Sequence, residues 1–439
     1  MPAPTDKATT AELIEMLRSR GEEDLDRAHV ALVARGEAIV DDLITALKDG
    51  SYQVRMGAAR ALGAMKATAA LGDLVETLAD PSVNVQRMGV ESLAMMGPQA
   101  VPMLVEKLED KDPKMRRRAA ETLGMIADES ALTALVGSLG DENAEVRKEA
   151  ARALGKIKAS GATPRLLDML DDENVEICRY SAEALGEIGD TEAIPKLVMC
   201  LTSSSGDLRD TAVQALVKIG TDSVPELVKL LKHHNPHGRL HAADALGRLG
   251  DPRAFDPLTE ALADENDRVR HYAAEALGKV GQADPQKAVR ALLPLLKEKH
   301  RDIRSVSINA LRELGGPVAV QALSDMLGDV NAMVRLQAAQ ALLEIGDPAA
   351  VEPLVRGLRD SEWSVRAFCA EALGQIGQAN AVIPLVLAAA DEKAAVKLKV
   401  VEALGRLGDA RARHALEIAA RDHDTEVREA ARAAAEQLG

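Results

Sequence analysis

The sequence predicts an all-α protein, a right-handed α-solenoid of about fourteen two-helix repeats. Three observations predict it: a motif of about 31 residues recurs along the chain, apolar residues recur at helical spacing, and aromatic residues are nearly absent. The 439 residues include only three Tyr, two Phe and one Trp, although a globular core of this size normally depends on such side chains for buried area. Abundant Ala and Leu instead favour thin helical layers that stack on one another.

Three copies show the repeat clearly. "LGDENAEVRKEAARALGKI" begins at Leu139, "LADENDRVRHYAAEALGKV" at Leu262 and "LRDSEWSVRAFCAEALGQI" at Leu358. When each copy is aligned on the Leu of its "AL" pair, successive copies lie 30 to 34 residues apart, at Leu62, Leu93, Leu123, Leu154, Leu185, Leu216, Leu246, Leu277, Leu311, Leu342, Leu373 and Leu404. A repeat unit that cannot bury its apolar face alone must stack on its neighbours.

The repeats leave no room for a separate domain. We expect a disordered N-terminal tail over residues 1–10 and a single solenoid over 11–439. Its first repeat, about 11–37, and its last, about 411–439, are degenerate copies that we expect to act as caps. Caps discourage end-to-end stacking, so a monomer is expected.

The first helix of each repeat is expected to start near a proline in many copies, because the missing N–H is not needed in a first helical turn; the examples are Pro102, Pro164, Pro195 and Pro225. An Asp follows in the turn, as at Asp141 and Asp360. The second helix opens with Val-Arg and continues Ala-Ala-x-Ala-Leu-Gly. We expect the Gly after the Leu to help the chain bend as it leaves the helix.

Positions in the second helix are numbered here from the Val of Val-Arg as zero. Positions 0, 4, 7, 8 and 11 fall on one face at about 100° per residue. In the copy that begins at Leu139 these are Val146, Ala150, Ala153, Leu154 and Ile157. This face is predicted to be the core, and positions 2, 3, 6 and 10 are left facing outward on the concave side.

"DENAEVRKEAARALGKI" and the corresponding stretches resemble HEAT-like repeats of the phycobilisome-lyase (E–Z) type, from about residue 11 onward. The resemblance implies the α-solenoid and its layout. That repeat type occurs in bilin lyases, in enzyme subunits and in many binding scaffolds, so the resemblance leaves the activity open.

Charge and composition exclude several classes of function. Lys and Arg number 54 against 69 Asp and Glu, a net charge of −15, which repels nucleic-acid backbones and anionic lipid. No apolar run approaches the ~20 residues that span a bilayer. We therefore expect no nucleic-acid or membrane partner. Cys178, Cys200 and Cys369 lie far apart without paired spacing, as expected of buried reduced thiols in a cytoplasmic protein.

No catalytic motif is present. Deoxyhypusine hydroxylase resembles this architecture but holds a di-iron centre with His-Glu pairs, and this sequence has no His-Glu dipeptide. HEAT-like DNA glycosylases use a basic, aromatic groove, whereas position 6 here is acidic in seven repeats: Glu91, Glu121, Glu183, Asp244, Glu275, Glu371 and Glu402. Some of these carboxylates are expected to pair one helical turn away, Glu275 with Lys279 and Glu402 with Arg406. We expect no cofactor and no catalytic residue.

Two sets of residues are candidates for partner binding. Position 2 is basic in four consecutive repeats, at Arg87, Arg117, Lys148 and Arg179, with Arg118 beside it. This basic column either binds an acidic partner segment or is neutralised locally, because Arg87, Arg117 and Arg179 each precede a Glu by four residues.

The second set is a column of aromatic and polar residues at positions 2 and 3. Tyr180, Tyr272 and Phe368 share position 3 with Thr211 and His241, and His271 occupies position 2 beside Tyr272. These residues either form a binding patch, whose composition is typical of interface hot spots, or fill the grooves between neighbouring helices. Trp363 lies in a turn, where it either caps a repeat junction or is exposed.

The stretch "KHHNPHGRLH" at 232–241 raises the alternative of a metal site. His233 stands where most copies have Asp, and Asn235 with Pro236 is typical of a helix N-cap and first turn. Exposed histidines in a turn are more often solvated than metal-bound, so we assign no metal ligand.

The leading hypothesis is a non-enzymatic scaffold that binds a protein partner on its concave surface. The alternative from the enzyme class is a bilin lyase-like or isomerase-like subunit, whose pocket would need basic residues for tetrapyrrole propionates. The basic column with Tyr180 is the only candidate for such a pocket. Metal binding through His233–His241 is the third hypothesis.

Overall fold

The computed structural model describes residues 8–19 and 21–438, and within these residues every regular element is a helix. The chain forms two compact units, the first ending at Ser223 and the second beginning at Val224. Most of the expected N-terminal tail, residues 1–7, lies outside the described residues, and the first helix begins at Thr10 behind the capping residue Thr9. No helix in the described chain is long and apolar enough to cross a bilayer.

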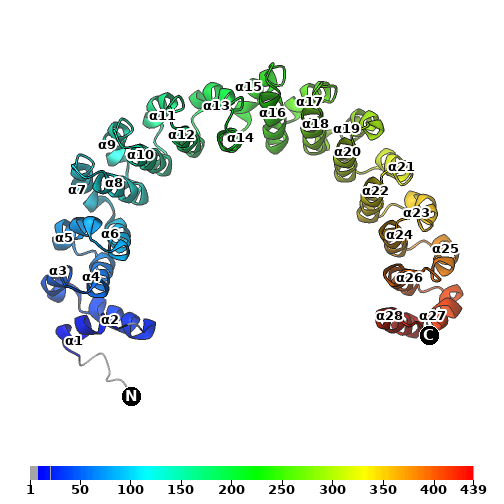
Figure 1. Ribbon diagram of the computed structural model, residues 1–439, viewed down its shortest axis with the longest axis horizontal. Coiled ribbons are helices and arrows are strands. Elements are labelled where there is room, and N and C mark those ends of the chain that lie inside the picture. The colour runs from blue at the N-terminus through cyan, green and yellow to red at the C-terminus, as the bar shows by residue number, and fades with distance from the viewer. Residues whose placement is uncertain (1–7, 20, 439) are drawn as a thin grey trace. The chain divides into compact units, whose positions relative to one another are not determined.

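The first unit is a row of seven helix pairs, shown from blue to green in Figure 1. The first helices of its pairs are α1 Thr10–Met16, α3 Val40–Ala46, α5 Leu71–Glu76, α7 Val101–Lys107, α9 Leu132–Ser138, α11 Thr163–Met169 and α13 Ile194–Cys200. The second helices are α2 Glu22–Ala34, α4 Tyr52–Ala64, α6 Val83–Met96, α8 Pro113–Ile126, α10 Ala144–Ile157, α12 Val175–Ile188 and α14 Gly206–Ile219.

The second unit is also a row of seven pairs, shown from green to red in Figure 1. Its first helices are α15 Val224–Leu230, α17 Phe255–Ala261, α19 Pro285–Leu292, α21 Pro317–Met326, α23 Val351–Gly357, α25 Val382–Ala388 and α27 Arg413–Ala419. Its second helices are α16 Pro236–Leu249, α18 Asp267–Val280, α20 Arg301–Leu314, α22 Ala332–Ile345, α24 Trp363–Ile376, α26 Ala394–Leu407 and α28 Thr425–Gln437. Within each unit the second helices form one layer and the first helices the other, so the predicted two-helix repeat is confirmed.

Short 3-10 helices lead into most of the first helices or end them. They are η2 Gly36–Ile39, η3 Thr68–Ala70, η4 Thr77–Ala79, η5 Gly97–Ala100, η6 Glu129–Ala131, η7 Ser160–Ala162, η8 Thr191–Ala193, η9 Thr221–Ser223, η10 Pro252–Ala254, η11 Gly281–Ala283, η12 Leu293–Lys297, η13 Pro348–Ala350, η14 Ala379–Ala381 and η15 Ala410–Ala412. Pro102, Pro164 and Pro195 lie in the first turns of α7, α11 and α13, as predicted.

The core is the predicted face of the second helices. In α10 the residues at positions 0, 4, 7, 8 and 11 are all buried, from Val146 at 0% exposed to Ile157 at 8%. Within each unit, a second helix packs on the second helix of the next repeat and on its own first helix. Helices that bury two sides in this way leave positions 2, 3, 6 and 10 to form the inner surface.

The Gly after the Leu does not bend the chain, and that expectation was wrong. Gly374 lies inside α24, and a Cβ there would come within 2.6 Å of the Cα and Cβ of Ala403 in the next repeat. The same close approach recurs at Gly186 against Ala215. Glycine is needed because two helix backbones touch at this point. The bend is made by a later glycine, such as Gly189 with φ +77°.

Within the two units, the Arg of Val-Arg links many of the repeats to the next. Arg116 donates two hydrogen bonds, of 2.7 and 2.8 Å, to the carboxylate of Asp141, which lies 25 residues further along in the next turn. It also donates to the carbonyl oxygen of Asp110 in its own turn. The same ion pair recurs at Arg55–Asp80, Arg147–Asp172, Arg239–Asp264, Arg304–Asp329, Arg335–Asp360, Arg366–Asp391 and Lys397–Asp422. We call this series the Arg–Asp ladder.

Departures from the repeat coincide with changes in the ladder. Where three residues are inserted before α19, Arg270 pairs instead with Glu298, three residues beyond the usual place, at 3.4 Å. In α12 the ladder position is Cys178, whose thiol donates to the carbonyl oxygen of Asp172 at 3.2 Å. The acceptor place in the following turn is then Ser203, whose hydroxyl caps Ser205 as an Asp does elsewhere. The ladder therefore has no rung between these two repeats, nor at α6, where Gln86 occupies the ladder position.

Candidate functional site

The inner surface of the first unit carries the predicted basic column on four consecutive, mutually packed helices. Arg87 lies on α6, Arg117 on α8, Lys148 on α10 and Arg179 on α12. Second helices that pack together are about 8–10 Å apart. The column therefore presents one cation about every 10 Å along the row.

Local neutralisation of this column is incomplete. Arg87 approaches Glu91 at 3.9 Å and Arg117 approaches Glu121 at 3.7 Å, and neither pair forms a hydrogen bond. The third expected pair, Arg179 with Glu183, does not form. Arg179 makes no ion pair with any other described residue either. Exposed pairs of this geometry contribute about 0–1 kcal/mol. The carboxylates of their own helices thus hold these guanidinium groups only loosely.

Arg179, Tyr180 and Lys148 come together at the end of the column. The guanidinium of Arg179 lies over the Tyr180 ring, 4.1 Å from its centroid, and the Lys148 ammonium lies 5.5 Å from the same centroid. Lys148 also hydrogen-bonds Glu145, and this bond raises the pKa of Lys148 despite partial burial. The stacked arginine is held in place by the ring, without a direct ion pair to a described carboxylate.

Arg118, beside the column, is half-buried and bonds a neutral group. It donates to the amide oxygen of Gln86, which occupies the ladder position of α6. Partial burial, together with the positive charge of Arg117, lowers the pKa of Arg118. Arg118 thus adds a second positive charge beside Arg117 at this place.

Two hollows adjoin this cluster within the first unit. One, of about 400 Å³, lies between α12 and α14 and includes Arg179 and Thr211, with Asp207 and Asp210 also on its wall. The other, of about 380 Å³, lies between α10 and α12 and is lined by Tyr180 with Arg152, Lys156, Lys158, Glu183 and Glu187. Tyr180 is half-buried, so its ring both packs against α10 and borders open space.

The remaining predicted residues lie in the second unit. His241 on α16 and Phe368 on α24 are half-buried in the second-helix layer. His271 and Tyr272 on α18 are half-buried and meet edge to face, with ring centroids 5.6 Å apart. Each unit therefore carries its own part of the aromatic column.

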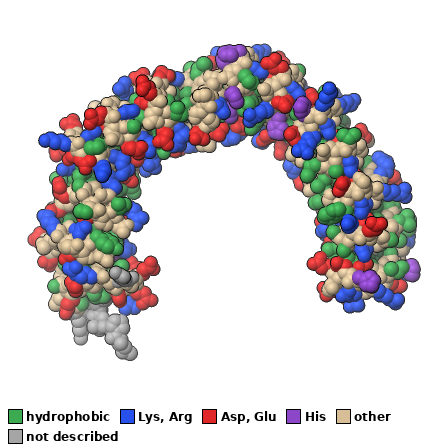
Figure 2. Space-filling model, viewed as in Figure 1, with side chains coloured by type: hydrophobic (Ala, Val, Ile, Leu, Met, Phe, Trp, Pro, Cys, Tyr) green, Lys and Arg blue, Asp and Glu red, His purple; other side chains and the backbone are tan. Residues whose placement is uncertain are grey.

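The acidic residues at position 6 are partly paired. Glu275 binds Lys279 at 2.9 Å, as expected. The expected pair of Glu402 with Arg406 does not form, and Glu402 instead binds Lys399 at 3.2 Å. Lys399, at position 3 of α26, also binds Glu371 on the neighbouring helix α24. Figure 2 shows acidic and basic side chains interspersed over the surface of both units.

The histidine-rich stretch is a rebuilt helix start. Asn235 caps α16 by accepting from the His237 amide, with Pro236 in the first turn, as predicted. His233 takes the role of the usual Asp, because its Nδ1 accepts a hydrogen bond from the Asn235 amide at 3.2 Å. Its ring stacks near that of His234, at 4.1 Å between centroids. Across the described part of the chain no three His, Cys, Asp or Glu side chains are grouped as metal ligands would be.

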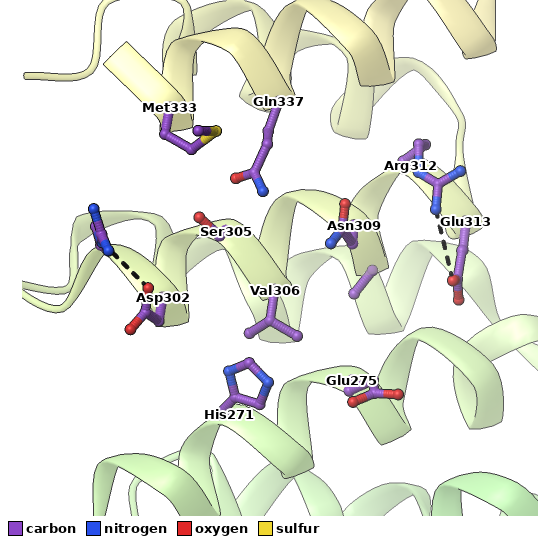
Figure 3. A pocket seen from close by; sticks show the side chains of 12 residues that line it. His271, Glu275, Asp302, Ser305, Val306, Asn309, Arg312, Glu313, Met333 and Gln337 are labelled. Carbon is purple, nitrogen blue, oxygen red and sulfur yellow. Dashed lines mark ion pairs between the residues drawn. The ribbon is translucent and has the colours of Figure 1, made fainter. Parts of the chain in front are cut away.

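Sequence reasoning missed a larger groove on the second unit. It has a volume of about 570 Å³ and is formed by α18, α20 and α22, with Asn309, Met333 and Gln337 among its lining residues (Figure 3). The available signal was the loss of charge at position 6, where Asn309 and Gln340 replace the acidic residues of neighbouring repeats.

These features define an α-solenoid, in which stacked helix pairs present an inner surface of second helices. The chain belongs to the HEAT-repeat family, whose sequence pattern it matches over residues 10–94, 72–144, 137–217, 200–278, 256–342, 327–393 and 351–436. No curated protein matches the sequence closely enough to be counted as a relative.

Solved structures of karyopherins share the fold. The chain is similar to Kap121p bound to Ste12p, with a TM-score of 0.68 and 15% identity, and all of this chain aligns with 57% of that one. It is also similar to Kap95p, solved with RanGDP, with a TM-score of 0.63 and 12% identity over 98% of this chain and 72% of that one. The chain thus spans little more than half the length of Kap121p. At these identities the likeness concerns the fold.

Proposed function

We propose that the protein is a non-enzymatic scaffold that binds an acidic segment of a partner protein on the inner surface of its first unit. The observation that carries this proposal is the loose pairing of the arginines at position 2, compared with the close pairing of arginines in the Arg–Asp ladder at position 1. At position 1 of the first unit, Arg55 and Arg116 each bind both carboxylate oxygens of a ladder Asp. At position 2, Arg87 and Arg117 are loosely paired, and Arg179 forms no ion pair with a described residue. The karyopherin structures are of proteins solved with bound proteins such as Ste12p and Ulp1p, which supports a protein partner.

The spacing of the column fits an extended chain. An extended segment advances about 3.3 Å per residue, so carboxylates three residues apart would meet successive cations about 10 Å apart. Tyr180, clamped between Arg179 and Lys148, supplies a rigid ring at one end. Tyrosine and arginine are the residues most often found at the energetic centres of interfaces.

A labelled acidic peptide of about twelve residues, rich in Glu and Asp, tests the proposal by fluorescence anisotropy. We expect binding that weakens as salt rises. Arg117→Ala with Arg179→Ala should weaken it at least tenfold, while the matched control Arg248→Ala, in the second unit, leaves it unchanged. Equal affinity for the double variant and the control would contradict the proposal.

We propose that residues 11–439 act as one solenoid with degenerate caps, as a monomer in the cytoplasm, and the unpaired state of all three cysteines supports that location. Crosslinking in the native cell would identify the partner. Replacing Tyr180 and Tyr272 with Ala should abolish its recovery while helicity and melting temperature stay nearly unchanged.

A second candidate function rests on the hollow between α10 and α12. Its Tyr180 ring and the cations Arg152, Lys156 and Lys158 supply the flat and basic groups that a bilin with two propionates would need. This candidate corresponds to the phycobilisome-lyase subtype of the repeat. Adding a bilin to concentrated protein should then shift the bilin's absorbance, and an unchanged spectrum would eliminate the candidate.

A further inference from the structure

The groove on the second unit differs in chemistry from the basic column. Three consecutive second helices form it: α18 contributes His271 and Glu275, α20 contributes Ser305 and Asn309, and α22 contributes Met333 and Gln337 (Figure 3). Its volume of about 570 Å³ falls in the range of ligand-binding clefts.

The charged groups around this groove already have partners. Glu275 binds Lys279 at 2.9 Å, and Arg301 lies 3.4 Å from Asp302. Arg312 binds Glu344 on α22 and also approaches Glu313. Such pairs leave the groove without a dominant charge, so it does not select a strongly acidic or basic ligand.

The side chains between these ion pairs have unused hydrogen-bonding capacity. The amide oxygen of Gln337 is buried and accepts no hydrogen bond, and such an oxygen costs about 1–3 kcal/mol when left unsatisfied. In Figure 3 the Gln337 amide extends from α22 toward α20, where Ser305 and Asn309 lie. Neither Ser305 nor Asn309 forms a side-chain hydrogen bond with any described residue.

Carboxamides match the polypeptide main chain. Each supplies one acceptor oxygen and an NH₂ donor, the complement of a peptide N–H and C=O. A chain in the polyproline-II conformation leaves all of its main-chain groups unpaired and repeats every three residues, or about 9.3 Å. That repeat equals the separation of about 8–10 Å between packed helices, so Asn309 on α20 and Gln337 on α22 can bind residues i and i+3 of such a chain.

We propose that this groove binds an extended, uncharged segment of a partner polypeptide through its main chain, with Asn309 and Gln337 as the hydrogen-bonding residues. Val306 is buried at the base of the groove, and Met333 is 54% exposed at its edge. A flexible methionine beside an apolar base accommodates varied apolar side chains. The His271 ring lies beside Val306 and closes the groove on the α18 side (Figure 3). This site does not depend on the basic column of the first unit.

Selection from phage-displayed random peptides of about twelve residues on the full-length protein supplies the probe, and resynthesised peptides are then measured by fluorescence anisotropy. We expect uncharged sequences whose affinity hardly changes with salt. Asn309→Ala and Gln337→Ala should each weaken binding about tenfold or more. The matched control Gln214→Ala, at the same helix position as Asn309 but on α14, should have no effect.

Two further measurements decide the mode of binding. Methylating one main-chain nitrogen of the peptide should abolish binding at the contacting residue, because the modification removes the N–H donor and leaves the side chain intact. Arg117→Ala with Arg179→Ala should leave this peptide's affinity unchanged, which separates this site from the acidic-segment site. Failure to select any peptide, selection of charged peptides that salt displaces, or full affinity of Asn309→Ala would each overturn the proposal. Since Asn309 is exposed, its replacement leaves the fold intact.

Discussion

Arg116 and Arg117 are consecutive residues with opposite surroundings. Arg116 is 8% exposed and holds both carboxylate oxygens of Asp141, whereas the nearest carboxylate to Arg117 is Glu121 at 3.7 Å. The helix turns by about 100° between them, which directs one guanidinium into the junction between repeats and the other onto the inner surface. One arginine therefore joins two repeats, and the other belongs to the proposed binding surface.

Separate alanine substitutions test this division. Arg116→Ala leaves Asp141 half-buried without its partner and should lower the free energy of unfolding by about 2–3 kcal/mol. Arg117→Ala removes only a loose, partly exposed pair and should lower it by less than about 0.5 kcal/mol. Denaturant titration followed by circular dichroism measures both. Comparable losses for the two variants would show that position 2 is structural as well.

The inward glycine at the helix contact provides a second test. Gly374→Ala places a Cβ within 2.6 Å of the Ala403 backbone, and such overpacking costs about 1–3 kcal/mol. Gly137→Ala is the matched control, because a Cβ at this exposed helical glycine meets nothing within 4 Å. It should stabilise the protein by up to about 1 kcal/mol through helix propensity. Thermal melts of the two variants should therefore shift in opposite directions.

Glu149 gives a pH dependence of known sign. It is 4% exposed, and its burial raises its pKa although Arg152 lies beside it. A raised pKa means that the folded state favours the protonated form of Glu149. The protonated group's contribution to the free energy of unfolding is therefore complete below its ordinary pKa of 4.5. That contribution is lost as the pH rises through the higher pKa of the folded state. Glu149→Gln should then melt at a higher temperature than wild type at neutral pH.

That difference should shrink as the pH falls toward 4, where Glu149 of the wild type is protonated as well. Glu145→Gln is the control on the same helix, since Glu145 is exposed. A variant that melts below wild type at neutral pH would show that the ion pair with Arg152 outweighs burial.

The ladder bond that is missing between α12 and α14 can be restored. Cys178→Arg places a guanidinium where the thiol already bonds the Asp172 carbonyl, and Ser203→Asp supplies the acceptor where the hydroxyl already caps Ser205. Together they should raise the free energy of unfolding by about 1–2 kcal/mol beyond the sum of the single variants. A double-mutant cycle measures this coupling, and strictly additive effects would exclude a ladder bond at this position.

The repeat pattern predicted the fold because stacking constrains nearly every apolar position. Val146 and Leu154 are buried where their spacing required. The sequence predicts only part of the ladder. The turn Asp and the Val-Arg both recur in the repeat, but the sequence does not indicate that they pair across repeats. That pairing depends on how adjacent helix pairs are stacked, a property of tertiary structure that spacing within one repeat does not contain.

The two proposed binding surfaces were less predictable from the sequence. The basic column was found from sequence, but only the structure shows that Arg179 stacks on Tyr180 instead of pairing with Glu183. Whether an exposed arginine faces a ring or a carboxylate depends on small differences in side-chain energy. The groove with Asn309 and Gln337 escaped notice because neutral amides carry no strong signal in a sequence. What distinguishes Asn309 and Gln337 is that their side chains form no hydrogen bond with a described residue, and this is seen only in the structure.

Because each ladder bond joins one repeat only to the next, the array can change length in whole periods. Removing residues 361–391 would delete Arg366 together with its partner Asp391, leaving Arg335 with Asp360 and Lys397 with Asp422. Such a deletion leaves no ladder residue without its partner. A deletion of a different length, or one that begins elsewhere in the repeat, can separate a ladder arginine from its aspartate. The ladder thus sets the size of the step by which a chain like this one can grow or shrink by duplication and loss.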